Sequence, residues 1–260
     1  MRNTQRRELA VCGLEAVRAV VAVRPGSVRR FFYSADRARE FGNFCGKLAG
    51  GHRPYRLVEA AELEKLCGTA HHQGVAAMVD DLPPAGVTDA LVAGWARSGA
   101  RVVVLDRVGD DHNLGSIARS AAFFGWNALV IGLDDGAARL STSAYRVARG
   151  ALEHIPVYAD DSAARFAARC KGMVATVGAD HNGTRSLREY RGQLVGVVPT
   201  RETLPAGMAL FLGNEESGLS PAVRASCTEI VRIDGAGLVE SLNVSQAAAV
   251  LLYELAPPTR

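Results

Sequence analysis

Hydrophobic positions follow two periodicities along the chain, one typical of strands and one typical of helices. From Arg101 onward, short apolar runs alternate with segments of helical spacing, as in a mainly parallel sheet flanked by helices. The runs that predict strands are Arg101–Leu105, Ala128–Ile131, Ile155–Tyr158, Met173–Val177, Leu194–Val197 and Ala209–Leu212. This alternation predicts the α/β fold class.

Two helices of this stretch have clear ends. Apolar residues recur at helical spacing over residues 244–255, and Pro257-Pro258 would end that helix. The other helix is expected to run from Asp161, as its N-cap, to Cys170.

The first 80 residues mix shorter elements and predict a small α/β domain. Strands are expected over Val28–Ser34, Tyr55–Val58 and Val75–Val79. Helices are expected over Gly13–Val23, over Asp36–Leu48 with Asp36 as N-cap, and over Ala60–Cys67.

A linker separates this region from the longer one. Charges, a Pro pair and a Gly gather in residues 80–86, and Thr88 would cap a short helix ending near Arg97. We therefore expect a small domain over 1–80, a linker and short helix over 81–100, and a larger domain over 101–260.

Membrane and disulfide-rich classes do not fit the sequence. No apolar run reaches the roughly 18 residues of a membrane-spanning helix, and no apolar signal core follows the charged start. The five cysteines are scattered without C-x-x-C spacing, which predicts reduced thiols. Because His71 and His72 have no Cys or carboxylate at ligand spacing, we expect no metal site. These features predict a cytoplasmic protein.

The net charge of +3 is unevenly distributed. Residues 1–56 carry 12 Lys/Arg against 4 Asp/Glu, residues 57–100 carry 2 against 6, and residues 101–260 carry 16 against 17. A basic segment in a near-neutral chain fits contact with a polyanion. A solvated surface fits equally well in a chain whose 30 basic residues are mostly arginine.

A first polar motif, residues 113–119, follows the strand ending at Leu105 and lies where a helix begins. Backbone N–H groups and the positive end of the helix dipole suit an anionic group there. The guanidinium of Arg119 fits a phosphate. The alternative is that Asn113 caps the helix and Arg119 is a surface residue.

A second motif, residues 213–220, follows the apolar strand that ends at Leu212. Gly213 and Gly218 allow a sharp turn or close approach of a ligand, and Glu215 lies at the carboxyl end of a strand, where α/β sheets place ligand sites. Ser220 is the expected N-cap of the next helix, with Pro221 as its first residue. A plain strand-to-helix turn would explain the same residues.

A third motif, residues 235–245, is a glycine-containing loop that leads into the final helix. Ser241 and Asn243 immediately precede this helix, and either could be its N-cap. Capping explains one polar residue of the loop but not the whole loop.

Together these three segments resemble the signature motifs of the SpoU (TrmH-like) RNA 2′-O-ribose methyltransferases of the SPOUT class. The match rests on Asn113, Gly115 and Arg119, on Gly213, Glu215, Gly218 and Ser220, and on Ser241, Leu242, Asn243, Val244 and Ser245. One departure is Ile233-Asp234-Gly235, where many members carry Ile-Pro-Met.

The resemblance also reaches the first region. Residues 11–17 and 72–76 are similar to the start and end of an RNA-binding domain with a ribosomal-protein-like fold that several members carry. The resemblance therefore covers nearly the whole chain and implies that the basic segment contacts RNA, either ribosomal or transfer RNA.

For the larger domain, the resemblance implies a carboxyl-terminal trefoil knot that binds S-adenosylmethionine, and a homodimer without metal. The loops that would hold the cofactor contribute Leu212, Gly213, Asn214, Gly218, Ile233, Gly235, Leu242 and Val244. The catalytic set it implies is Asn113, Arg119, Glu215, Ser241 and Asn243, with Arg119 acting at the partner's cofactor.

The role of Arg119 stays open between two readings. The family arginine is often named a general base, yet guanidinium groups keep their proton at neutral pH. Clamping the neighbouring phosphate fits equally well.

Two other classes of protein are weighed against this interpretation. One is an RNA-binding protein of the same fold with little or no catalytic activity, which cofactor binding would test. The other is a dinucleotide-binding oxidoreductase, but Gly235-x-Gly237 is followed by Glu240 and does not complete G-x-G-x-x-G.

Overall fold

The computed structural model describes residues 2–3, 7–196 and 207–256 of the chain. These residues form two compact units, and each is considered by itself. Unit 1 comprises the chain up to Pro83 together with Arg139–His154, and unit 2 comprises Pro84–Ala138 and the residues from Ile155 onward.

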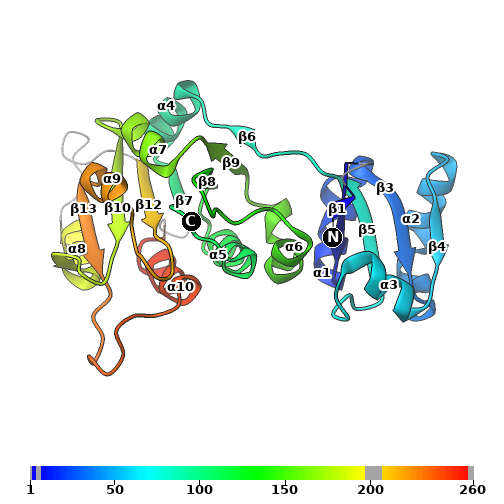
Figure 1. Cartoon of the computed structure of the whole chain (residues 1–260). Coiled ribbons are helices and arrows are strands. Elements are labelled where there is room, and N and C mark those ends of the chain that lie inside the picture. The colour runs from blue at the N-terminus through cyan, green and yellow to red at the C-terminus, as the bar shows by residue number, and fades with distance from the viewer. Residues whose placement is uncertain (1, 4–6, 197–206, 257–260) are drawn as a thin grey trace. The chain divides into compact units, whose positions relative to one another are not determined.

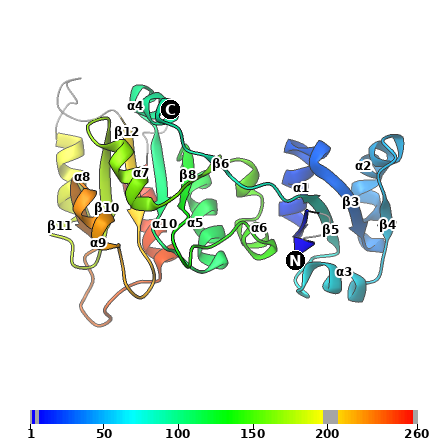
Figure 2. The ribbon, with the colours of Figure 1, turned by 45° about the horizontal axis from the view of Figure 1, so that its top comes forward.

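Unit 1 is built on a five-stranded sheet (Figures 1 and 2). Its strand order is β1-β2-β5-β3-β4, antiparallel except for the parallel pair β3–β4. The strands are β1 (Arg2–Asn3), β2 (Glu8–Cys12), β3 (Val28–Tyr33), β4 (Tyr55–Leu57) and β5 (Val75–Asp80). The helical segments are α1 (Leu14–Val23), η1 (Pro25–Ser27), η2 (Ala35–Arg37), α2 (Ala38–Gly50) and α3 (Ala60–Cys67).

Alternating side chains of this sheet pack into two cores, one on each face. Val11 and Ala77 face α1 and α2, where Phe31, Phe41 and Phe44 form the centre of one core. The neighbouring positions on the same strands face α3 in the second core, which contains Ala10, Cys12, Ala76, Met78, Leu63 and Cys67. Helices therefore cover both faces of the sheet, because successive residues of a strand point to opposite faces.

Two segments noted in the sequence meet at the start of α1. The backbone N–H of Gly13 donates to the carbonyl of His72 at 3.2 Å, and that of Leu14 donates to Oε1 of Gln73 at 2.8 Å. The ring of His72 is buried, and its Nδ1 accepts from the N–H of Gly74. His72 therefore belongs to the framework of this turn.

The segment Arg139–His154 contributes α6 (Thr142–Ala148) and η3 (Ala151–Glu153) to unit 1. Tyr145 packs against the first core, and Glu153 accepts from Arg24 at 2.6 and 2.8 Å. Gly150 has a φ of +94°, and a Cβ there would lie 2.9 Å from the methyl group of Ala19. Only glycine fits this close contact between the segment and α1.

Unit 2 is built on an eight-stranded, wholly parallel sheet of order β11-β13-β10-β12-β7-β8-β9-β6. Its strands are β6 (Ala85–Gly86), β7 (Arg101–Leu105), β8 (Ala128–Gly132), β9 (Val157–Asp160), β10 (Val174–Ala179), β11 (Arg185–Ser186), β12 (Gly207–Leu212) and β13 (Glu229–Arg232). Its helices are α4 (Asp89–Ser98), α5 (Asp111–Phe123), α7 (Ala163–Cys170), α8 (Leu187–Gly196), α9 (Pro221–Ser226) and α10 (Val244–Glu254).

Helices cover both faces of the parallel sheet, which explains its continuous apolar strands. On one face, α4, α7 and α9 pack on Val102, Val104 and Phe211 (Figure 1). On the other lie α5 and α10, which contact each other, and Trp126 donates from Nε1 to the carbonyl of Leu252 at 3.0 Å.

The sequence predictions for strands are confirmed with small shifts, with one exception. Residues 194–196 of the strand predicted over Leu194–Val197 lie in α8, and Val197 lies outside the described residues. Ser186 and Glu189 explain the error, because each side chain accepts from the other's backbone N–H, at 3.1 and 2.9 Å. This capping box starts a helix, and a short apolar run does not separate helix from strand. The prediction missed β1, β2, β6, β11 and β13.

Helix caps were predicted with mixed success. Thr88 and Ser220 cap α4 and α9 as expected. Asp36 and Asp161 are not caps, because Asp36 lies inside η2 and the hydroxyl of Ser162 caps α7 by accepting from the N–H of Arg165. The predicted end of the last helix at Pro257-Pro258 lies outside the described residues.

The different burial of two leucines in unit 1 predicts how much each contributes to the free energy of unfolding. Leu63 is 0% exposed in the second core of unit 1, whereas Leu57 is 54% exposed on β4. We expect Leu63→Ala to lower the free energy of unfolding by about 3–5 kcal/mol through a buried cavity. Leu57→Ala should cost less than about 1 kcal/mol. Urea unfolding followed by circular dichroism measures both, and equal losses would contradict this assignment of the core.

Candidate active site

The candidate site lies at the carboxyl edge of the sheet in unit 2. Leu105 pairs with Leu212, Leu212 pairs with Ala179, and Ala179 pairs with Val231. The strands are parallel, so the loops that follow β7, β12, β10 and β13 all leave from the same edge. This is where open α/β sheets bind ligands.

The first motif lies inside α5 rather than at its cap. Asp110 is the N-cap, and its side chain accepts from the N–H of His112 at 2.8 Å. The alternative that Asn113 caps the helix is therefore wrong. Asn113 is buried, and its Nδ2 donates to Oε1 of Glu215 at 2.7 Å, which joins the first and second motifs.

The second motif is a tight loop closed by its own backbone. Asn214 and Gly218 exchange two backbone hydrogen bonds of 3.0 Å, and Oδ1 of Asn214 accepts from the N–H groups of Glu216 and Ser217. A Cβ at Gly213 would collide with the backbone of Gly218. Glycine is therefore required at 213, and the loop holds Glu215 toward Asn113.

Asp106 connects the end of β7 to the second motif and was not predicted. It is 1% exposed, and its Oδ2 accepts from the N–H of Ser220 at 2.6 Å. Its own N–H donates to the carbonyl of Leu212 at 2.9 Å. The sequence signal for this residue was an Asp directly after an apolar strand. Its carboxylate fixes the far end of the loop that begins at Gly213.

A second unpredicted cluster follows β10. The carboxylate of Asp180 is paired with Arg224 of α9 and accepts from the N–H of Asn182. Arg224 also donates to the carbonyl of Asn182 at 3.2 Å, and a Cβ at Gly218 would lie 3.6 Å from Oδ2 of Asp180. The loop after β10 is therefore held beside the second motif.

The third motif forms an exposed loop between β13 and α10 (Figure 1). Asn243 is the N-cap of α10, because its Oδ1 accepts from the N–H and the hydroxyl of Ser245 at 2.8 and 2.7 Å. Ser241 and Gly235 are exposed, Ile233 is half-buried, and Val244 is buried. No hydrogen bond in the described part of the chain joins this loop to Asn113 or Glu215.

Arg119 is also separate from the Asn113–Glu215 pair. It is exposed on α5, and within the described ranges its guanidinium makes no hydrogen bond or ion pair. The structure thus brings Asn113, Glu215 and the second-motif backbone together, while Arg119 and Ser241 face solvent.

The two cysteines of unit 2 have thiols whose pKa values are raised. Burial raises the pKa of the Cys170 thiol to about 12, and burial followed by the charge of Asp106 raises that of Cys227 to about 12 as well.

Among the described residues, no three His, Cys, Asp or Glu side chains are placed to hold a metal ion. No described helix has the length and hydropathy needed to cross a membrane.

Two family descriptions match the chain. Residues 100–253 match the SpoU rRNA Methylase family, and residues 10–85 match the family described as RNA 2′-O ribose methyltransferase substrate binding. Because the first match covers more than half of the chain, the protein belongs to the SpoU rRNA methylase family.

Similar proteins include two curated relatives that match this chain over more than nine-tenths of its length. The "23S rRNA (guanosine-2′-O-)-methyltransferase RlmB" of Nitrosomonas europaea is 31% identical, over 94% of this chain and 89% of its own. The "Uncharacterized tRNA/rRNA methyltransferase YfiF" of Escherichia coli O157:H7 is 31% identical, over 98% and 69%.

A solved structure is also similar over most of its length. The SpoU methyltransferase AviRb of Streptomyces viridochromogenes, in complex with AdoMet, is 26% identical, with a TM-score of 0.69, over 96% of this chain and 90% of its own.

The raised pKa values predict unreactive thiols. At pH 8 a thiol of pKa about 12 is deprotonated in about one molecule in ten thousand, so Cys170 and Cys227 should resist iodoacetamide in the folded protein. Peptide mass spectrometry before and after denaturation measures this. Labelling of Cys227 as fast in the folded as in the denatured protein would contradict the prediction.

Proposed function

We propose that this protein transfers a methyl group from S-adenosylmethionine to the 2′-hydroxyl of a ribose in structured RNA, ribosomal or transfer RNA. Membership of the SpoU family supports the proposal, as do relatives named for 23S rRNA guanosine-2′-O methylation. The observation that carries it is the 2.7 Å hydrogen bond from Asn113 to Glu215, which joins two motifs 102 residues apart.

The residues at the carboxyl edge fit the cofactor. A nucleoside ligand needs apolar surface for its base and a few well-placed polar groups for the rest of the molecule. Ile233 and Leu242 leave apolar surface uncovered, and the backbone of residues 213–218 borders the same edge. We assign cofactor binding to Leu212, Gly213, Asn214, Gly218, Ile233, Gly235, Leu242 and Val244. When bound, the cofactor supplies an electrophilic methyl group.

The protein's own side chains would then orient the ribose and stabilise the negative charge that develops on its 2′-oxygen. The attacking 2′-oxygen must lose its proton and be aimed at carbon. We assign Arg119 to the phosphate next to the target ribose, where its unpaired guanidinium would also favour the developing alkoxide. Asn113 and Glu215 would orient the substrate, and Ser241 and Asn243 would shape the site at the start of α10.

The division of labour between the regions follows the two family matches. We assign substrate RNA binding to residues 1–80, a connection to 81–100, and methyl transfer to 101–260, whose carboxyl-terminal segment would form the trefoil knot. The five free thiols fit a reducing compartment, so we place the activity in the cytoplasm.

We further propose that the enzyme acts as a homodimer. Phe123 and Tyr253 are 83% and 63% exposed, and both rings contact Phe124, at centroid distances of 5.2 and 5.6 Å. An exposed aromatic cluster of this kind on α5 and α10 fits a protein interface. A second copy covering it would place α5, the helix that carries Arg119, in the interface.

Arg119→Ala should lower methyl transfer at least about 100-fold, because it removes a group that stabilises charge in the transition state. Cofactor binding should change by no more than a few-fold. Transfer of labelled methyl to RNA and calorimetric titration of the cofactor measure the two effects. Arg97→Ala is the matched control, since Arg97 is exposed on α4 and should leave both unchanged. Loss of cofactor binding in Arg119→Ala would make Arg119 structural.

The methylated atom should be the ribose 2′-oxygen. The raised pKa of Cys227 and Cys170 disfavours a thiolate that could attack a pyrimidine ring, whereas the 2′-hydroxyl needs no covalent activation of a base. Once nucleoside mass spectrometry has mapped the target, a substrate with a single 2′-deoxynucleotide at that position should accept no methyl group. Methylation of this substrate at an undiminished rate would move the reaction to the base.

A further inference from the structure

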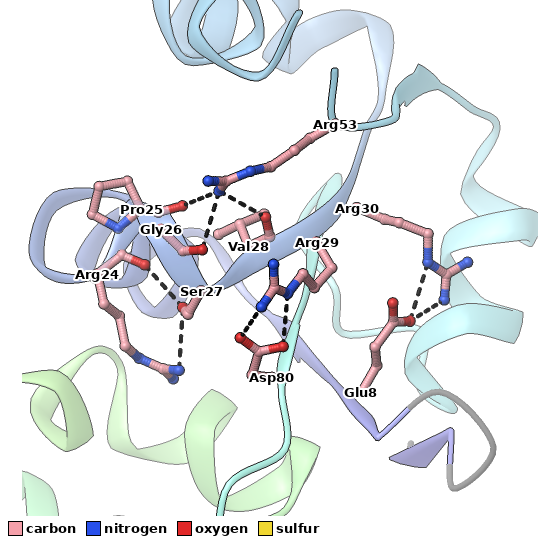
Figure 3. A network of polar contacts seen from close by, with 10 residues as sticks. All are labelled: Glu8, Arg24, Pro25, Gly26, Ser27, Val28, Arg29, Arg30, Arg53 and Asp80. Atoms are coloured by element: carbon pink, nitrogen blue, oxygen red, sulfur yellow. Dashed lines mark hydrogen bonds and ion pairs between the residues drawn. The ribbon is translucent and has the colours of Figure 1, made fainter. Parts of the chain in front are cut away.

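Most basic side chains in the first 56 positions form ion pairs or hydrogen bonds within the protein. Figure 3 shows Arg29 on the carboxylate of Asp80, Arg30 on Glu8, and Arg53 donating to three backbone carbonyls. The other paired side chains are Arg18 with Glu15 and Glu40, Arg24 with Glu153, Arg37 with Asp36 and Glu40, and Arg56 with Glu62. Six arginines of this segment are therefore paired with carboxylates, whereas the carbonyl groups around Arg53 hold its side chain without cancelling its charge.

Among residues 7–56, Arg53 is held only by backbone carbonyls, and the side chains of three further cations make no hydrogen bond or ion pair with the described part of the chain. They are Arg7, Arg39 and Lys47, and the last two lie on α2. Arg39, Asn43 and Lys47 are each separated by four positions, so they share one face of the helix. All three are exposed, whereas Phe41, Phe44, Cys45 and Leu48 form the opposite, buried face.

Nothing on α2 cancels the charge of this outward face. Glu40 is the only acidic residue of the helix, and it is held by Arg18 at 2.6 Å and lies 3.9 Å from Arg37. Gly42 and Gly46 lie between the cations, and no atom is within 4 Å of where their Cβ atoms would be. The face is therefore positive, flat and open to a bulky partner.

We infer that the outward face of α2, with Arg39, Asn43 and Lys47, docks the phosphate backbone of the substrate RNA. The inference rests on the proposed RNA methyltransferase function and names the contact surface within residues 1–80. Charge complementarity selects the partner, because two uncompensated cations and an amide donor match phosphate oxygens. Arg39 and Lys47 are about 12 Å apart along the helix axis, which suits two separate phosphates.

The test is the salt dependence of RNA binding by the full chain. Fluorescence anisotropy with a labelled RNA hairpin of mixed sequence would compare the wild type with the double variant Arg39→Gln/Lys47→Gln. Each lost phosphate contact reduces the slope of log K against log salt by about 0.7–0.9, so the double variant should lose about 1.4–1.8. Its affinity at low salt should fall by about tenfold or more.

The control is Arg97→Gln/Lys171→Gln, which removes the same two charges from exposed positions of unit 2. Its slope should equal that of the wild type, and both variants should keep the wild-type melting temperature. An unchanged slope in the α2 variant, with wild-type RNA binding intact, would overturn the assignment of this face and leave the proposed function standing.

Two further outcomes separate the alternatives. If the α2 variant alters the oligomeric state in sedimentation while its salt slope stays that of the wild type, the face is a protein contact and the inference is wrong. If the wild type binds no RNA and transfers no methyl group to it, the proposed function fails together with the inference.

Discussion

The parallel pairing of β7, β12 and β10 is the constraint on which the candidate site depends. It places Leu105, Leu212 and Ala179 side by side, so three loops from distant parts of the sequence leave one edge together. The buried carboxylate of Asp106 then holds Ser220, and Asn113 holds Glu215. Without this register, the first and second motifs would share no contact, because 102 residues separate Asn113 from Glu215.

A net charge counted from the sequence does not show which charged side chains are free to bind a partner. Arg24, Arg29 and Arg30 all contribute to the positive total of the first 56 residues, yet each lies against a carboxylate. Two of those carboxylates, Asp80 and Glu153, lie outside the counted segment. Arg39 and Lys47 of α2, in contrast, have no carboxylate partner among the described residues, because the helix itself supplies none for them.

Sequence-based prediction succeeded at helix ends that a single neighbouring residue determines. Thr88 and Ser220 cap the helices that follow them, and Gly68 ends α3 in a left-handed conformation, because each effect acts within one helical turn. Prediction failed where two local signals competed. Asp161 and Ser162 are both good caps, and only the position of the first helical turn selected Ser162.

The sequence by itself determined the α/β class, most strands and helices, and the three motifs, since periodicity and residue type are local properties. Only the tertiary structure decided that Asn113 donates to Glu215, that Asp106 and Asp180 support the second motif, and that residues 139–154 pack with the first unit. These depend on which strands become neighbours and which faces become buried. Such contacts join residues far apart in the chain, and no periodicity within one segment encodes them.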